Sequence, residues 1–145
     1  MKTLFRWWAV LVVVAVVVQI GLAGVGAFRT AKLADKAGLV QKKTVEDFWN
    51  PHAALGYVIV ILALVLLVIA AIAWRAQVKH SAALFGLTIL QVLLAALGYW
   101  KGALGFFHPI NALAIAGLSG RIAFEAWSGR ARGAEQAPVS EGAAS

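Results

Sequence analysis

Apolar residues run through this chain in four long stretches separated by short polar ones. No charged side chain falls within residues 7–28, 48–74, 81–100 or 102–120. A helix needs roughly 20 apolar residues to cross the hydrocarbon core of a bilayer, and each stretch has about that length or more. The pattern predicts an all-α integral membrane protein folded as a bundle of four transmembrane helices.

The positions where charges stop and start set the expected elements. We place the spans at about residues 6–28, 51–75, 81–100 and 106–127, with a polar outer loop over residues 29–50 that has room for some helix. The membrane bundle therefore occupies residues 1–128. Residues 129–145 are rich in Gly, Ala and Ser with scattered charge, and we expect a disordered cytoplasmic tail there.

Three polar positions are candidate helix starts. Thr44, with Asp47 three residues later, has the form of a capping box. Asn50 before Pro51 is an alternative start for the second span, since asparagine suits the N-cap and proline suits the first helical position. Ser81 is the expected N-cap of the third span.

The first apolar stretch has a second interpretation as a secretory signal peptide. Lys2 and Arg6 would form its basic start, and residues 25–27, Val-Gly-Ala, resemble a cleavage site. Its apolar run exceeds the roughly 7–15 residues usual for such signals. Three more spans follow, so a retained helix completes an even-numbered bundle, and we favour the retained span.

Composition supports the membrane interpretation. Apolar residues make up 62% of the chain and charged residues only 13%, which is outside the ordinary range for soluble domains. The absence of cysteine excludes disulfides, cysteine-ligated zinc and iron–sulfur clusters. Tryptophan favours the headgroup level of a membrane, and all six tryptophans fall near predicted span ends: Trp7, Trp8, Trp49, Trp74, Trp100 and Trp127.

The net charge of +7 indicates topology rather than nucleic-acid binding, because the basic residues cluster between spans and form no basic groove pattern. With the N-terminus inside, the short turn after the second span and the residues after the fourth are basic and cytoplasmic. The outer loop mixes its lysines with acidic residues. We therefore predict a multi-pass protein with both termini in the cytoplasm.

Two histidines stand at the heads of alternate spans. His52 begins the second and His108 the fourth, and each has a small residue four positions later, Gly56 or Ala112. At 1.5 Å per residue, His52 lies roughly 33 Å and His108 roughly 28 Å from the tryptophan at the far end of its span, so the depths match to within about a turn. Two imidazoles on facing helices can ligate one haem iron, with facing nitrogens roughly 4 Å apart.

An alternative for this pair is that both histidines are interfacial and hydrogen-bond backbone or water near the headgroups. Ionisable groups at membrane depth are costly and usually functional. Under the ligand interpretation, Gly56 and Ala112 lie below each imidazole on the same helix face and leave clearance for a flat macrocycle. We interpret His52 and His108 as metal ligands, with Gly56 and Ala112 beside the cofactor.

Gln19 and Gln91 are the strongly polar side chains deep within their spans. Each lies ten residues from the next outer charge, so roughly 15 Å deep. We expect them to face one another or a ligand, and interhelical hydrogen bonding is favoured over direct contact with a cofactor or quinone. They begin similar segments, residues 19–26 and 91–98, so the bundle is expected to consist of two similar helical hairpins.

The remaining polar residues carry no enzyme signature. His80 is expected to be a polar residue in a short turn, and Arg121 is expected to pair with Glu125 four residues on. No span interior holds a carboxylate, and no phosphate loop, Ser–His–Asp set or HExxH motif is present. We therefore do not expect the chain to be an enzyme by itself.

With its histidines at the heads of the second and fourth spans, the chain resembles a four-helix membrane cytochrome b module, and most closely one half of haem A synthase. The positions that match the family's ligands are His52 in His52-xxx-Gly56 and His108 in His108-xxx-Ala112, and the resemblance covers about residues 5–127. The family's N-terminal half has a glutamate one turn before its first histidine, whereas residues 48–51 here are Phe-Trp-Asn-Pro. The chain is also similar to uncharacterised small four-span bacterial membrane proteins whose fourth spans carry an HP(I/V)NAL-type motif.

These features together predict a protein of the bacterial plasma membrane that binds one b-type haem between His52 and His108 near the outer face. The expected role is electron transfer, or haem sensing or handling, with a quinone, a membrane redox partner or a second copy of the chain as partner. The alternative is a cofactor-free structural or accessory subunit of a larger membrane complex. A transporter is disfavoured, since no span has an interior charge or a broken centre.

Overall fold

The computed structural model describes residues 1–37 and 41–128, and this part of the chain contains helices and no strand. The four long helices are each long and apolar enough to cross a membrane, as the sequence predicts. Two short 3₁₀ helices connect them. The elements are α1 (Lys2–Ala37), α2 (Lys42–Ala73), η1 (Arg75–Gln77), α3 (Val78–Trp100), η2 (Gly102–Phe106) and α4 (Phe107–Ser128).

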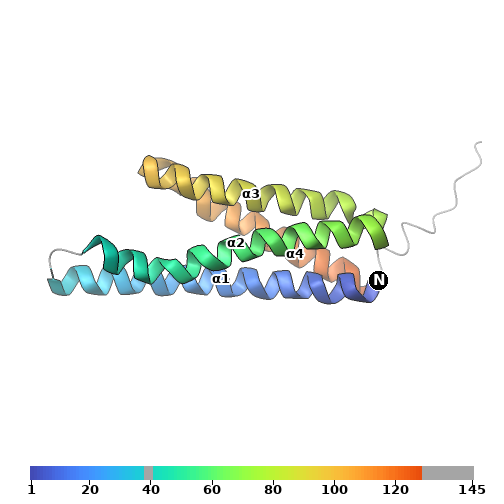
Figure 1. Ribbon diagram of the computed structural model, residues 1–145, viewed down its shortest axis with the longest axis horizontal. Helices are drawn as coiled ribbons and strands as arrows, with labels where there is room; N and C mark the ends of the chain where they lie inside the picture. Colours follow the sequence, from blue (N-terminus) through green and yellow to red (C-terminus); the bar gives the residue numbers. More distant parts are fainter. Residues whose placement is uncertain (38–40, 129–145) are drawn as a thin grey trace, which may run out of the picture.

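The helices form a ring in which each packs against two neighbours. α1 contacts α2 and α4, and α3 contacts the same two helices from the other side. Successive helices run in opposite directions, so the start of α4 and the first part of α2 lie toward the end of the bundle opposite the N-terminus (Figure 1). This end carries His52 and His108 and is called the histidine end. Toward the histidine end α3 diverges from α2, and α1 and α2 continue beyond the α3–α4 hairpin (Figure 1).

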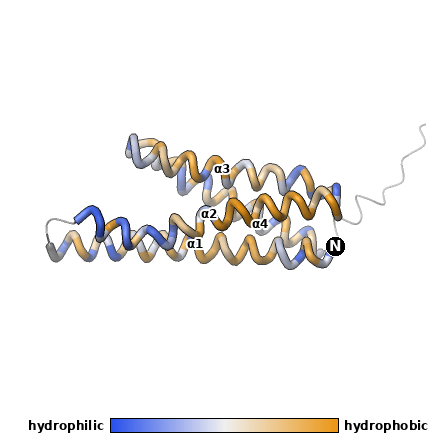
Figure 2. Tube along the Cα trace, viewed as in Figure 1, coloured by the Kyte–Doolittle hydropathy of each residue, from blue (hydrophilic) through white to orange (hydrophobic). Residues whose placement is uncertain are grey.

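The tightest packing lies toward the N-terminal end. Phe5, Leu66, Leu84 and Ile122, one from each long helix, are completely buried there. Figure 2 shows that the central part of the bundle is hydrophobic, and many apolar side chains on its outside remain exposed, including Ile61 and Leu113. This pattern suits helices that meet lipid on their outer faces and one another on their inner faces.

Two tryptophans point inward instead of toward a headgroup layer. Trp74 is only 2% exposed and packs edge-on against Phe5, with ring centroids 5.4 Å apart. Trp8 is partly buried and its indole N–H donates to the backbone carbonyl of Leu62 at 2.9 Å. Their positions near helix ends therefore reflect packing as well as any preference for the interface.

The polar stretch assigned to an outer loop, residues 29–50, is largely helical. α1 continues to Ala37, and α2 begins at Lys42 after the N-cap Gln41, so neither Thr44 nor Asn50 caps the start of this helix. Pro51 lies inside α2. Solvent-exposed ion pairs at i,i+4 spacing, Lys42–Glu46 and Lys43–Asp47, lie along this first part of α2.

Trp49 gives the extended helices a tertiary anchor. Its indole ring lies against Gly26, where an added Cβ would come within 3.1 Å of the ring. Its N–H donates to the hydroxyl of Thr30 at 3.3 Å, and that hydroxyl donates to the Gly26 carbonyl at 2.8 Å. These contacts between α1 and α2 therefore hold the two helices together beyond the predicted ends of their membrane spans.

The third span also begins earlier than expected. α3 starts at Val78, directly after η1, so Ser81 is buried in the first turn of the helix and is not its N-cap. His80 belongs to the same turn and is helical. The expected disordered tail, residues 129–145, lies outside the described residues.

Candidate functional site

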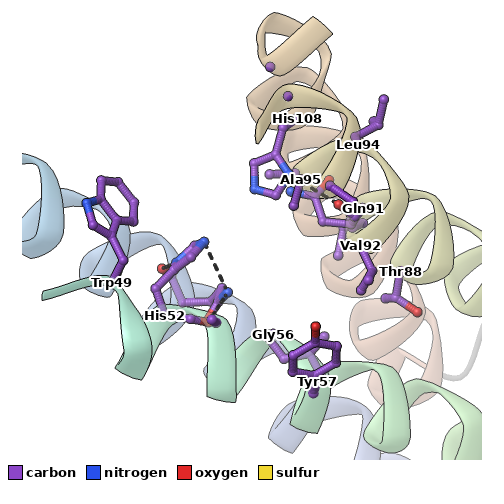
Figure 3. A pocket seen from close by; sticks show the side chains of 18 of the residues that line it. Trp49, His52, Gly56, Tyr57, Thr88, Gln91, Val92, Leu94, Ala95 and His108 are labelled. Carbon is purple, nitrogen blue, oxygen red and sulfur yellow. Dashed lines mark hydrogen bonds between the residues drawn. The ribbon is translucent and has the colours of Figure 1, made fainter. Parts of the chain in front are cut away.

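A cavity of about 710 Å³ opens at the histidine end, where α3 diverges from α2 (Figure 3). Its volume falls within the roughly 300–1,000 Å³ typical of sites for small molecules and cofactors. All four long helices and η2 line it, and no charged residue of the described chain does so. The structure brings the six predicted site residues to its wall: Gln19, His52, Gly56, Gln91, His108 and Ala112.

The imidazole of His52 is oriented by the neighbouring helix. Its Nδ1 lies 3.1 Å from the backbone carbonyl oxygen of Gln19 on α1. A carbonyl oxygen can only accept a hydrogen bond, so Nδ1 carries the proton and Nε2 carries the lone pair. The Trp49 indole also meets this ring in a T-shaped contact, with centroids 5.8 Å apart.

His108 makes the equivalent contact in the second hairpin. Its Nδ1 lies 3.2 Å from the backbone carbonyl oxygen of Gln91 on α3. The same reasoning places the proton on Nδ1 and the lone pair on Nε2. In Figure 3 the ring reaches from α4 into the cavity, on the side that faces His52.

The two imidazoles are close enough to act on one bound atom. Their ring centroids are 6.2 Å apart, and the ring planes are inclined at 61°. Two imidazoles that ligate one iron from opposite sides, with metal–nitrogen bonds of about 2 Å, have centroids roughly 6 Å apart. A backbone carbonyl that accepts from the far ring nitrogen is also the usual support for a metal-ligating histidine.

The two glutamines do not meet each other, and each hydrogen-bonds across its own hairpin. The Gln19 amide donates to the backbone carbonyl of His52 at 2.8 Å, and its nitrogen lies 3.4 Å from His52 Nε2. The Gln91 amide oxygen accepts from Asn111 at 2.7 Å. These are the interhelical hydrogen bonds favoured by the sequence, although both partners differ from those expected.

The two small residues, Gly56 and Ala112, both line the cavity, and Gly56 has a further role. Gly56 lines the cavity, but an added Cβ there would meet the Gln19 amide nitrogen at 3.2 Å, so this glycine makes room for a side chain of the protein. Ala112 lines the opposite wall. Gly98 and Gly105 bring the end of α3 against η2, which forms the outer rim.

Sequence reasoning missed Asn111, which lies behind the cavity-lining Gln91, and three residues of the cavity wall itself. Asn111 is 7% exposed and bridges α4 to α3, and the visible signal was an amide three residues after His108 within an apolar span. Tyr57, Thr88 and Trp49 all line the cavity. The sequence predicts Trp49 only as an interfacial aromatic residue.

His80 lies in a separate polar cluster at the N-terminal end. Its Nδ1 is 3.6 Å from a Glu125 carboxylate oxygen, which also accepts from Gln77 at 3.3 Å. The other Glu125 oxygen accepts from Arg121 at 2.7 Å, so the predicted Arg121–Glu125 pair is confirmed. His80 therefore does not contribute to the cavity.

No family model, no curated protein and no solved structure matches this chain. The resemblance to haem A synthase therefore remains a hypothesis based on the two histidine motifs.

Proposed function

We propose that this protein binds one b-type haem between His52 and His108 and uses it for electron transfer or for haem sensing or handling. The observation that carries the proposal is the pair of imidazoles, 6.2 Å apart across the cavity, each with Nδ1 directed at a backbone carbonyl. This arrangement leaves the Nε2 side of each ring as the side suited to a metal.

The number of ligands favours haem over a bare metal ion. No group of three or more His, Cys, Asp or Glu residues that could hold a metal lies in the described ranges. A structural zinc ion needs four ligands and a catalytic one needs three from the protein. Haem iron needs only one or two from the protein, because the porphyrin supplies the other four.

The cavity walls suit a flat, mostly apolar macrocycle. Ile20, Ala53, Val92 and Ala95 line the cavity, and the whole wall is uncharged. His52 and His108 would hold the iron, and the carbonyls of Gln19 and Gln91 would orient the two rings. The bound haem would supply one-electron chemistry, while the apolar wall limits access of water to the metal.

We place the site near the outer face of a bacterial plasma membrane, with both termini in the cytoplasm and lipid around the bundle. The far end of α2 lies roughly 33 Å from His52, so one haem at this end cannot carry electrons across the whole membrane. A quinone, a membrane redox protein or a second copy of this chain would complete the path. The alternative is a cofactor-free accessory subunit of a larger complex.

An absorbance spectrum of the purified protein tests the proposal. Protein expressed with adequate haem, or supplied with haemin in detergent, is expected to show a Soret band and the low-spin bands typical of two imidazole ligands. His52→Ala and His108→Ala should each abolish the low-spin spectrum. His80→Ala is the matched control, because His80 is distant from the cavity, and it should retain the spectrum.

Two results would overturn the proposal. Wild-type protein that stays colourless after haemin is added would favour the accessory-subunit role. A low-spin spectrum that survives loss of either cavity histidine would show that haem binds elsewhere. Retention of the helical circular dichroism spectrum would show that each variant is folded.

A further inference from the structure

The two histidines of the cavity have unequal surroundings because their helices differ at one position. Three residues after His108 comes Asn111, whereas three residues after His52 comes Leu55. The Asn111 amide donates to the Gln91 side-chain oxygen at 2.7 Å and to the Leu87 carbonyl at 2.9 Å. In the second hairpin, the glutamine side chain is therefore tied to an asparagine.

In the first hairpin, Leu55 occupies the position of that asparagine and does not hold the Gln19 side chain. Leu55 cannot hydrogen-bond, and the Gln19 amide instead reaches His52, donating to its backbone carbonyl at 2.8 Å. The same amide nitrogen lies 3.4 Å from His52 Nε2, the atom with the lone pair. Gly56 provides the space, and the Gln19 side-chain oxygen is buried with no hydrogen-bond partner among the described residues.

The lone pair of His52 is thus shared with an amide of the protein. Within residues 1–37 and 41–128, no hydrogen bond of this kind reaches Nε2 of His108, whose Nδ1 contact is the same as that of His52. An Nε2 lone pair can accept an N–H or ligate a metal, but it cannot do both. Any metal ligated by His52 therefore has to displace Gln19, whereas ligation by His108 displaces no protein group.

We infer that His108 is the permanent haem ligand and His52 an exchangeable one, with Gln19 as the positioning residue that competes for it. This inference rests on the proposed haem function and assigns a regulation to the same site. When His52 is bound by Gln19, one coordination position is open to a small neutral diatomic ligand. The site then suits sensing or transfer of haem better than electron transfer through a fixed six-coordinate centre.

Carbon monoxide is a suitable probe, because it binds reduced haem where an axial position can open. The affinity of the reduced haem protein for carbon monoxide is measured from the shift of the Soret band. Gln19→Leu should lower this affinity roughly 5-fold, the factor that corresponds to one hydrogen bond of ordinary net strength. Gln77→Leu is the matched control, because this glutamine hydrogen-bonds Glu125 and does not line the cavity, and it should leave the affinity within about 2-fold of wild type.

Retention of haem gives an independent measurement. After gel filtration in detergent, His52→Ala should keep most of its haem as a high-spin species, whereas His108→Ala should lose most of it. Asn111→Leu should release Gln91 toward His108 and lower haem retention, while the Gln91→Leu/Asn111→Leu double variant should recover it. This recovery distinguishes competition by Gln91 from a simple loss of packing.

The outcomes separate the two proposals. Wild-type protein that binds no haem refutes the proposed function, and this inference with it. Wild-type protein that binds haem, with equal losses in His52→Ala and His108→Ala and no effect of Gln19→Leu on carbon monoxide affinity, refutes the inference alone. A higher carbon monoxide affinity in Gln19→Leu would also refute it.

Discussion

Gly98 and Gly105 lie in backbone contact where α3 meets η2, and a Cβ built on Gly98 would be 2.7 Å from the Gly105 Cα. Real Cβ atoms do not approach a backbone carbon so closely, and no flexible side chain is available to move aside. The glycine pair therefore fixes the position of η2 against the end of α3. Because η2 contributes Gly105 to the cavity wall, this contact also shapes the rim.

Gly98→Ala is expected to destabilise the protein by about 1–3 kcal/mol, the usual cost of forcing extra volume into a packed contact. Gly86→Ala is the matched control, since it lies in the same helix with nothing within 4 Å of the added Cβ. The control should be neutral or stabilising by up to about 1 kcal/mol, because alanine favours helix. Thermal unfolding in detergent, followed by circular dichroism, measures both, and equal melting temperatures would contradict the prediction.

Gly56→Ala tests the space occupied by Gln19. The added Cβ would meet the Gln19 amide nitrogen at 3.2 Å, and a side-chain amide can shift by a few tenths of an ångström. We expect little loss of stability, below about 1.5 kcal/mol, but a weaker Gln19–His52 contact. In the haem-loaded protein, carbon monoxide affinity should fall in the same direction as in Gln19→Leu. The double variant should show no further decrease, and additive effects would argue against a shared cause.

Trp49→Ala removes the anchor of the helical extension of α1 and α2. It deletes the packing against Gly26 and the hydrogen bond to Thr30, so residues 29–50 should open more often while the rest of the bundle stays folded. Limited trypsin digestion should cut the extension at least several-fold faster. Thr30→Val, which loses only the hydrogen bond, should have a smaller effect, and unchanged digestion of Trp49→Ala would show that other contacts hold the extension.

Glu125→Gln tests whether the two ends of the bundle are independent. The change removes the charge that meets Arg121, a pair in which the arginine side chain is 61% exposed and the carboxylate 19%. The expected loss of stability is at most about 1 kcal/mol, because an exposed arginine contributes little net energy to an ion pair. The absorbance of the haem-loaded protein should not change, and a shifted Soret band would reveal coupling between this cluster and the cavity.

The four long helices could be predicted from the sequence because the charge-free stretches are long and the composition is strongly apolar. Their ends could not, since these depend on contacts between helices. Trp49 packs on Gly26 in the part of α2 that precedes the expected start, and Pro51 falls within the helix. Ser81 is likewise buried inside α3, which begins at Val78. Local capping preferences of about 1 kcal/mol are too weak to determine a boundary against such packing.

The candidate site was partly visible in the sequence. His52 and His108 could be paired by their matched depth, which helix geometry fixes, and the structure places both in one cavity. The partners of Gln19 and Gln91 could not be found in this way. Which way an amide reaches depends on the rotation of each helix about its axis, and on whether a residue such as Asn111 is there to bind it.

Because α1 and α2 extend farther than α3 and α4, the two sides of the cavity entrance differ in length. Residues 29–37 of α1 continue for roughly 13 Å past the last apolar turn, whereas the α3–α4 hairpin ends sooner along the bundle axis (Figure 1). The shorter side, at the end of α3 and on η2, carries the exposed rings of Trp100 and Phe106. A molecule that enters the cavity from solution is therefore blocked on one side by the extension of α1 and α2. Its open path passes the exposed aromatic rings at the end of α3 and on η2.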